Sequence, residues 1–293
     1  MKNKLKWALV LSGGGARGFA HIGILKGLED AGFPEPSLIV GTSMGAIVGG
    51  LYACGMTSSE LLQFAIKEFN ISDYLDNFFF KLDGPIGQIM QAGKMIANLA
   101  GHPGADRGQR VLDLFNRLTN GKKFEDTKIP FRCNAMDLYS GREVIFKSGS
   151  VALAMRASMS FPLFFDPLLT DGMCLVDGGL YDNMPVSIAR DEGYKNILAV
   201  NVNRFILANE NEFKSAHQVL YRCMEAFLRN QKEQKASGAS LILNVDSDNT
   251  PFSFYKKKEF IDLGENAVQT NMEALKKFFR KRKKIFGRNN AKT

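Results

Sequence analysis

The sequence predicts an α/β protein built on a mostly parallel β-sheet with helices on both of its faces. Short apolar segments that read as strands alternate with longer helical segments along most of the chain. The strand segments are apolar throughout, which is typical of strands buried on both faces. The chain has 293 residues, of which 45% are hydrophobic and 23% charged. One large domain can therefore bury its own core without disulfides or metal.

The first part of the chain supplies two strand–helix units. The elements expected here are strands at 7–11 and 38–40 and helices at about 19–31 and 43–54. Gly55 is placed to end the second helix, as glycine often does at the position after the last helical residue. Thr57 and Glu60, three residues apart, have the spacing of a capping box, which predicts a third helix.

The N-terminal segment MKNKLKWALVL begins with basic residues and continues into an apolar run, as a signal peptide does. The run covers only residues 7–11, whereas a signal peptide needs roughly 7–15 apolar residues. No stretch reaches the roughly 20 apolar residues of a transmembrane helix. Four cysteines, which show no metal-ligand or CxxC spacing, are expected to be buried reduced thiols: Cys54, Cys133, Cys174 and Cys223. These features predict a first β-strand in a cytoplasmic protein.

The rest of the chain continues the alternation. The expected elements are strands at 131–137, 143–147, 168–170, 175–176, 196–201 and 241–244, and helices at about 109–118, 151–158, 213–235 and from 262 onward. We expect one main domain over residues 5–265. Within it, residues 70–125 are rich in Phe, Met and Gly and form either a helical lid or insert, or ordinary core packing. Residues 266–293 form a basic amphipathic C-terminal helix and tail.

Positive charge is concentrated at the end of the chain. The net charge is +8, and residues 276–293 hold nine Lys or Arg and no acidic residue. The remainder is close to neutral, which argues against a nucleic-acid-binding body. Four apolar residues fall on one helical face just before and within this segment: Val268, Met272, Leu275 and Phe279. This pattern predicts peripheral contact with anionic membranes through residues 276–288, so that the protein is membrane-associated; a solvated basic helix end is the alternative.

The glycine-rich segment GGGARG, residues 13–18, lies between the first strand and the first helix. It satisfies the GxGxxG pattern of dinucleotide-binding proteins. That fold also needs an acidic residue at the end of the second strand, and the second strand here ends LIVGTS. The segment still offers backbone N–H groups and the positive end of a helix dipole to a developing anion, with Arg17 nearby.

The segment GTSMG, residues 41–45, satisfies the GxSxG pattern of a nucleophile elbow. It follows a strand and opens a helix, as that strained turn requires. Gly41 and Gly45 remove side chains that would clash around Ser43. The pattern alone is weak, because a glycine turn with Ser43 as a helix N-cap gives the same letters.

A nucleophilic serine needs a base, and the three histidines are His21, His102 and His217. His21 is expected to pack inside the first helix, and His102 lies in a Gly/Pro loop. His217 gives the order Ser, Asp, His of an α/β-hydrolase but falls in a long polar helix. Asp177 is the better candidate, since it ends an apolar strand and partial burial raises carboxyl basicity. An ordinary Asp-Gly turn is the alternative.

The blocks GGGARG, GTSMG and DGG, in this order, resemble the patatin-like phospholipases, in particular compact bacterial members. The segment RASMSFPLFFDPL, residues 156–168, also resembles that family, and the resemblance covers about residues 6–205. It implies a three-layer α/β/α sandwich and a Ser43–Asp177 dyad without histidine. It implies Gly178 and Gly179 as the rest of the DGG motif. It also implies an oxyanion hole in the glycine loop, formed by Gly13, Gly14, Gly15, Ala16, Arg17 and Gly18.

The function implied by the resemblance is hydrolysis of fatty-acyl ester bonds in (lyso)phospholipids or related lipids. No cofactor and no metal are expected. The segments DNFFF and IGQIMQAGKMIANL, within residues 76–99, could supply an apolar channel or lid for the lipid. Two other readings remain open. One is a non-catalytic lipid-binding or regulatory protein that keeps the fold, and the other is an esterase that depends on His217.

Overall fold

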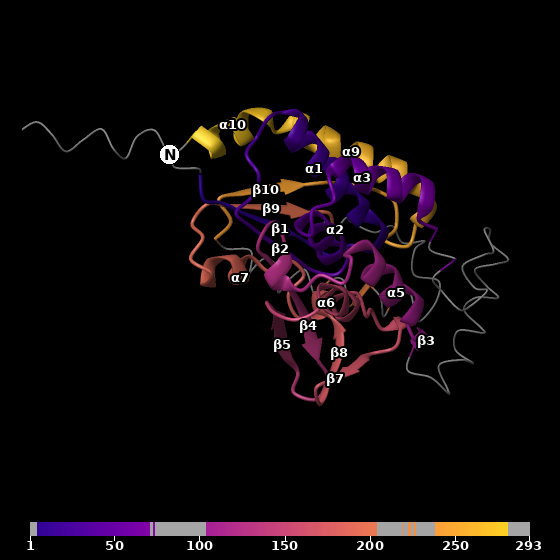
Figure 1. Ribbon diagram of the computed structural model, residues 1–293. Coiled ribbons are helices and arrows are strands. Elements are labelled where there is room, and N and C mark those ends of the chain that lie inside the picture. Colours follow the sequence, from indigo (N-terminus) through magenta and orange to yellow (C-terminus); the bar gives the residue numbers. More distant parts are fainter. Residues whose placement is uncertain are drawn as a thin grey trace, which may run out of the picture.

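The computed structural model describes residues 5–70, 73, 104–203, 219, 222–223, 226 and 238–280 (Figure 1). Several sequence predictions lie outside these residues. They are the lid segments within 76–99, the residues His102 and His217, most of the helix expected at 213–235, and the tail beyond residue 280.

The centre of the molecule is one eight-stranded sheet, and five of its strands run parallel. In spatial order these are β10 (Leu241–Asn244), β9 (Ile197–Asn201), β1 (Ala8–Leu11), β2 (Leu38–Gly41) and β4 (Phe131–Asp137). Each of the four pairings among them is parallel. Leu11 at the end of β1 pairs with Gly41 at the end of β2, so both glycine motifs begin at the same edge of the sheet.

The other side of the sheet is antiparallel. β4 also pairs with β5 (Arg142–Phe146) and with β8 (Met173–Asp177), and β7 (Leu168–Thr170) forms the far edge. A separate parallel pair, β3 (Gly104–Asp106) and β6 (Leu163–Phe165), was not predicted from the sequence. The mostly parallel sheet is thus confirmed, and an antiparallel extension completes it.

Helices cover both faces of the parallel strands, which gives three layers. Those whose buried residues join the larger core cluster are α1 (Ala20–Asp30), α2 (Met44–Ala53), α3 (Ser58–Gln63), α5 (Gln109–Leu118), α6 (Val151–Ser158), α9 (Lys257–Thr270) and α10 (Met272–Arg280). Leu9 of β1 joins that cluster, whereas Val10 joins a second cluster with α7 (Val186–Asp191). Figure 1 shows α9 and α10 on one side of the strands and α7 on the other. The α/β/α sandwich is therefore confirmed.

Local sequence signals set several helix boundaries. The Thr57 side chain accepts a hydrogen bond from the Glu60 amide, and Glu60 in turn accepts from the Thr57 amide, so the capping box before α3 is present. α3 continues directly into a single π-helical turn, η2 (Phe64–Glu68). Neither this turn nor the short helix α7 was predicted from the sequence.

The C-terminal helix begins earlier than expected, at Lys257 rather than near residue 262, and is divided in two. The break lies at Asn271, whose side-chain Nδ2 donates to the carbonyl oxygen of Ala267 at 2.8 Å. An asparagine side chain that binds the backbone in this way competes with the helical hydrogen bonds, which explains the interruption.

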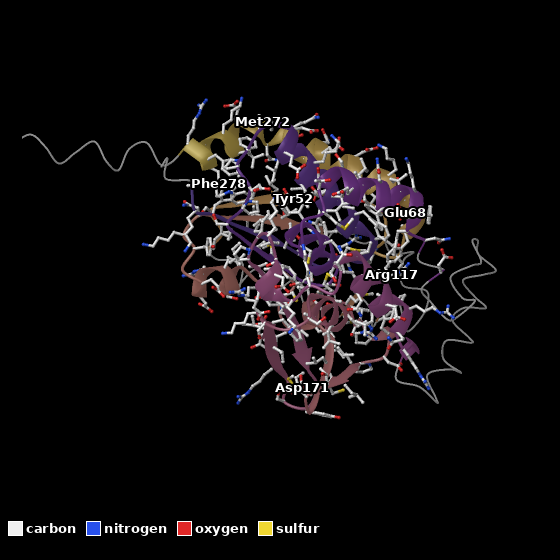
Figure 2. The ribbon with its side chains drawn as sticks, in the orientation of Figure 1. Tyr52, Glu68, Arg117, Asp171, Met272 and Phe278 are labelled. Carbon is white, nitrogen blue, oxygen red and sulfur yellow. The ribbon has the colours of Figure 1, made fainter. Side chains whose placement is uncertain are left out.

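The apolar face of α10 is buried in the core. Leu275 and Phe278 are 0% and 4% exposed. The Phe279 ring lies 5.2 Å from Trp7 and stacks on Phe33 at 4.6 Å. In Figure 2, Phe278 is labelled where this helix meets the body of the protein. This apolar face is therefore occupied by the protein's own core, and membrane contact through residues 276–288 stays a prediction.

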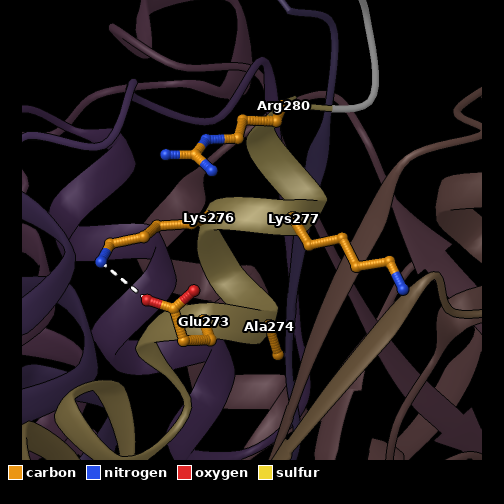
Figure 3. A pocket seen from close by; sticks show the side chains of 5 residues that line it. All are labelled: Glu273, Ala274, Lys276, Lys277 and Arg280. Carbon is orange, nitrogen blue, oxygen red and sulfur yellow. Dashed lines mark hydrogen bonds and ion pairs between the residues drawn. The ribbon is translucent and has the colours of Figure 1, made fainter.

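Three cationic side chains, those of Lys276, Lys277 and Arg280, lie on the outer part of α10 (Figure 3). Lys276 forms an ion pair with Glu273 at 2.8 Å, and Figure 3 shows Lys277 pointing to the opposite side of the helix. These charges therefore do not form one cationic face. Among the helices that the structure describes, none combines the length and apolar character needed to cross a bilayer.

All four cysteines are free thiols. Cys54 and Cys133 are buried, as predicted, and burial raises the pKa of the Cys54 thiol to about 11. Cys174 is only partly buried, and Cys223 is exposed. The expectation of burial is therefore wrong for Cys223.

Candidate active site

Ser43 lies in a strained turn between β2 and α2. Its backbone has φ 54° and ψ −122°, a region that residues other than glycine rarely adopt. The neighbouring glycines make the turn possible. A Cβ on Gly45 would lie 2.3 Å from the Leu11 carbonyl oxygen, and one on Gly41 would lie 2.4 Å from the Gly45 carbonyl oxygen. The strand–turn–helix context predicted for GTSMG is confirmed.

Asp177 reaches Ser43 from the other half of the sheet, at the end of β8. The Ser43 hydroxyl donates to Asp177 Oδ2 at 2.6 Å, although the two residues are 134 positions apart. The amide of Gly179 donates to Asp177 Oδ1 at 2.7 Å, which fixes the carboxylate within the DGG turn. The side chain is 2% exposed. This burial raises the pKa of Asp177 to about 7, against the opposing effect of the hydrogen bonds from Ser43 and Gly179.

His21 is a packed core residue, as predicted. It is fully buried, and its Nε2 donates to the carbonyl oxygen of Ser12 at 2.8 Å. Burial lowers the pKa of His21 to about 4, so its ring is neutral. His102 and His217 lie outside the described residues.

The glycine loop presents two free amides next to Ser43. Those of Gly14 and Gly15 donate to no acceptor in the described part of the chain, and both residues line the same cavity as Ser43. The amides of Gly13, Ala16 and Arg17 are engaged, donating to the carbonyl oxygens of Asn183, Pro251 and Gly14 at 3.1, 2.7 and 3.2 Å. The amides of Gly14 and Gly15 therefore stay available to an acceptor in the cavity, and the oxyanion hole of the glycine loop stays a prediction.

Arg17 and Gly18 connect the glycine loop to its surroundings. The Arg17 Nε donates to the carbonyl oxygen of Asn249, and its Nη1 donates to Asn203 Oδ1, both at 2.8 Å. Arg17 therefore ties the glycine loop to two later segments of the chain. A Cβ on Gly18 would lie 2.2 Å from Met44 Cγ, so Gly18 allows the loop to pack against the start of α2.

A buried polar bridge joins the Ser43 turn to the DGG turn. The Thr42 hydroxyl donates to Asn134 Oδ1 at 2.8 Å. Asn134, in the middle of β4 and fully buried, donates through Nδ2 to the carbonyl oxygens of Asp182 at 3.0 Å and Gly178 at 3.5 Å. We call this the Thr42–Asn134 bridge. Sequence reasoning missed it, although a polar Asn within the apolar strand FRCNAMD was the available signal.

The end of α6 makes a second connection to both residues. Ser158 Oγ accepts from the amide of Ser43 at 2.8 Å, and the Ser160 carbonyl oxygen accepts from the amide of Asp177 at 3.0 Å. Arg156, 1% exposed, donates to Ser160 Oγ and through Nη2 to the Asp166 carbonyl oxygen at 3.0 Å. The RASMSFPLFFDPL segment thus holds the backbones of Ser43 and Asp177 in place through hydrogen bonds.

An apolar cavity of about 180 Å³ opens at Ser43 and Asp177. Apart from these two residues, the polar side chains that line it are Asn183 and Asn203, and the rest of the lining is apolar or glycine. Many of the apolar residues are aromatic: Phe19, Phe64, Phe69, Phe115, Phe161, Phe164, Phe165, Phe252 and Phe254. A hydroxyl and a carboxylate at the mouth of such a cavity are positioned to meet a group attached to an apolar chain.

The chain matches the family described as Patatin-like phospholipase over residues 9–190. It is 32% identical over 197 residues to mouse "Patatin-like phospholipase domain-containing protein 6", covering 67% of this chain and 13% of that protein. It is 34% identical over 194 residues to "Lysophospholipase NTE1" of Mycosarcoma maydis, covering 66% of this chain and 9% of that protein. The chain therefore corresponds to a small part of these relatives.

Among solved structures, VipD from Legionella pneumophila has the same fold. The TM-score is 0.51 at 15% sequence identity, over 92% of this chain and 67% of VipD. The glycine loop, the Ser43 turn and the DGG turn all lie within the matched residues 9–190. This chain belongs to the patatin-like phospholipase family.

Proposed function

We propose that the protein is a serine-dependent lipid acyl hydrolase in which Ser43 is the nucleophile and Asp177 the general base. The observation that carries the proposal is the 2.6 Å hydrogen bond from Ser43 Oγ to Asp177 Oδ2 at the mouth of an apolar cavity. The bond has the direction that catalysis requires, from the nucleophile to the base. With a pKa of about 7, the buried carboxyl of Asp177 is ionised in a large fraction of the molecules near neutral pH. It is still basic enough to take a proton.

The reaction proceeds in two halves. Ser43 Oγ attacks the acyl carbonyl carbon while its proton passes to Asp177 Oδ2. The tetrahedral oxyanion accepts hydrogen bonds from the amides of Gly14 and Gly15. As the ester bond breaks, Asp177 returns the proton to the departing alcohol, and an acyl-Ser43 ester remains. Water then attacks this ester while its proton passes to Asp177. As the acyl–oxygen bond breaks, Asp177 returns the proton to Ser43 Oγ, which releases the fatty acid and restores both residues.

A fatty-acyl ester of a (lyso)phospholipid or related lipid is the substrate class that we propose. The lining of the cavity suits an acyl chain, because it is apolar apart from the groups at its mouth. The name of the fungal relative, lysophospholipase, agrees with this substrate class. The polar head remains outside the cavity in this arrangement.

We also propose that residues 5–265 act as one catalytic unit that extends beyond the matched residues 9–190. Pro251 accepts the Ala16 amide, and Asn203 and Asn249 accept from Arg17. These later segments therefore brace the glycine loop that holds the proposed oxyanion donors.

Three single variants test the mechanism with a p-nitrophenyl ester as substrate. We expect Ser43→Ala and Asp177→Asn each to abolish hydrolysis, and His217→Ala to retain it. Loss of activity in His217→Ala alone would replace the dyad with a histidine-dependent esterase. An inactive parent protein that still binds lipid would support the non-catalytic reading. Circular dichroism of each variant controls for folding.

A further inference from the structure

The apolar cavity is lined by two helices in the same pattern. α2 contributes Met44, Ile47, Val48 and Leu51, spaced at i, i+3, i+4 and i+7. This spacing places the four side chains on one face over two turns of helix. Ser43 immediately precedes α2, so depth in the cavity increases with residue number along this face. At about 1.5 Å per residue, Leu51 lies roughly 10 Å beyond Met44.

α5 contributes the same pattern on another wall, through Val111, Leu114, Phe115 and Leu118. The start of α5 lies near the nucleophile. Arg156 of α6 donates through Nε to the carbonyl oxygen of Gly108, the residue before α5, at 3.3 Å. Two residues further along α6, Ser158 binds the amide of Ser43 at 2.8 Å.

The far ends of α2 and α5 are also joined. Lys122, four residues after the end of α5, donates through Nζ to the carbonyl oxygen of Cys54 at 2.6 Å, just after α2. The two helices therefore run in the same direction away from Ser43. Their lining residues match in depth, with Val48 at the middle level and Leu51 and Leu118 at the deep end. Leu61, 2% exposed at the first turn of α3, lines the cavity just after α2 in the chain.

We propose that the facing stripes of α2 and α5 measure the length of the acyl chain. This inference rests on the proposed function. An acyl group bonded to Ser43 extends along α2, and each added carbon displaces it toward Leu51 and Leu118. Chains that fit gain contact with each methylene, whereas longer chains meet the side chains of Leu51, Leu61 and Leu118, which line the cavity. Specificity for chain length is therefore set by side-chain volume at defined helical levels, separately from the chemistry at Ser43.

The test compares p-nitrophenyl acetate, octanoate and palmitate as substrates for three variants. Val48→Phe adds volume at the middle level, so we expect the kcat/KM ratio of palmitate to acetate to fall about tenfold or more. Acetate is too short to reach Val48, so dividing by its kcat/KM removes any effect that the substitution has on the chemistry at Ser43 itself. Leu118→Ala enlarges the deep end and should raise the ratio of palmitate to octanoate.

Leu25→Ala is the matched control. Leu25 lies on α1 and is 2% exposed, the same as Leu51, but it does not line the cavity. It should lower thermal stability and leave both substrate ratios unchanged. Unchanged ratios in Val48→Phe and Leu118→Ala, with acetate hydrolysis intact, would overturn the measuring role. If Val48→Phe does not fold, Leu118→Ala decides the question alone. A parent protein that hydrolyses none of the three esters would overturn the proposed function itself.

Discussion

The two halves of the central sheet contribute to the candidate site in different ways. The parallel half supplies Ser43 through a strained turn that depends on close backbone packing at Gly41 and Gly45. The antiparallel half supplies Asp177 from the end of β8, where the carboxyl is buried and held by one amide. β4 belongs to both halves and carries Asn134. Backbone geometry therefore sets the position of Ser43 in the parallel half, and burial sets the basicity of Asp177 in the antiparallel half.

The largest expected effect comes from removing both contributions. Ser43→Ala and Asp177→Asn should each lower kcat on the order of 10⁴, because either change stops the same proton transfer. The double variant should be no worse than Ser43→Ala alone, as measured by p-nitrophenyl ester hydrolysis at equal concentrations of folded protein. A double variant in which the two losses multiply would mean that the residues act independently.

The Thr42–Asn134 bridge is the buried link between the two halves. Thr42→Val removes the hydroxyl and leaves the Asn134 amide oxygen without its 2.8 Å donor, so we expect kcat to fall roughly tenfold with KM unchanged. Thr42→Ser keeps the hydroxyl and should restore most of the activity. Full activity in Thr42→Val together with a loss in Thr42→Ser would show that the methyl group of Thr42, rather than the hydroxyl of the bridge, is required.

Burial of Asp177 also predicts a pH dependence of stability. Its pKa is about 7 in the folded protein and near 3.8 when exposed, so between these values the folded state keeps a proton that the unfolded state releases. The free energy of unfolding should therefore fall as pH rises from about 4 to 7, by at most about 1.4 kcal/mol per pH unit from this residue. Asp177→Asn should flatten this slope in urea titrations. An unchanged slope would show that Asp177 is not the group responsible.

The smallest expected effect concerns the basic residues that follow α10 in the sequence, which belong to neither half of the sheet. Deleting residues 281–293 removes six Lys or Arg and leaves the packed face of α10 intact. We propose that these charges hold the protein at anionic membranes, so sedimentation with phosphatidylserine liposomes should weaken several-fold, and less so at high salt. Hydrolysis of a soluble ester should not change. Equal sedimentation of both forms would remove the membrane role of the tail.

The sequence was sufficient for elements whose signals are local. The strand and glycine context of Ser43, the capping box at Thr57 and the apolar strand ending in Asp177 were all predicted. The pairing of Ser43 with Asp177 was predicted only from the resemblance of three short motifs to a known family. Hydrophobic periodicity could not predict this pairing, because it reports only on local secondary structure and the two residues are 134 positions apart.

Other features depend on tertiary packing and were missed or misread. The apolar face of α10 has the pattern of a membrane-binding helix, and Trp7 and Phe33, more than 200 positions earlier, are what place it in the core. The role of Asn134 could not be predicted from its apolar strand, because its hydrogen-bond partners come from two distant turns. The sequence also could not distinguish Gly14 and Gly15 as the proposed oxyanion donors. The carbonyl oxygens of Asn183 and Pro251, which accept from the amides of Gly13 and Ala16, come from distant parts of the chain.

The central claim is that the buried Asp177 activates Ser43, and the most direct test is the pH dependence of Ser43 labelling by an alkyl fluorophosphonate. We expect a labelling rate that rises about tenfold per pH unit, levels off near pH 7 and is lost in Asp177→Asn. A rate in Asp177→Asn equal to that of the parent protein, with the same pH profile, would contradict it.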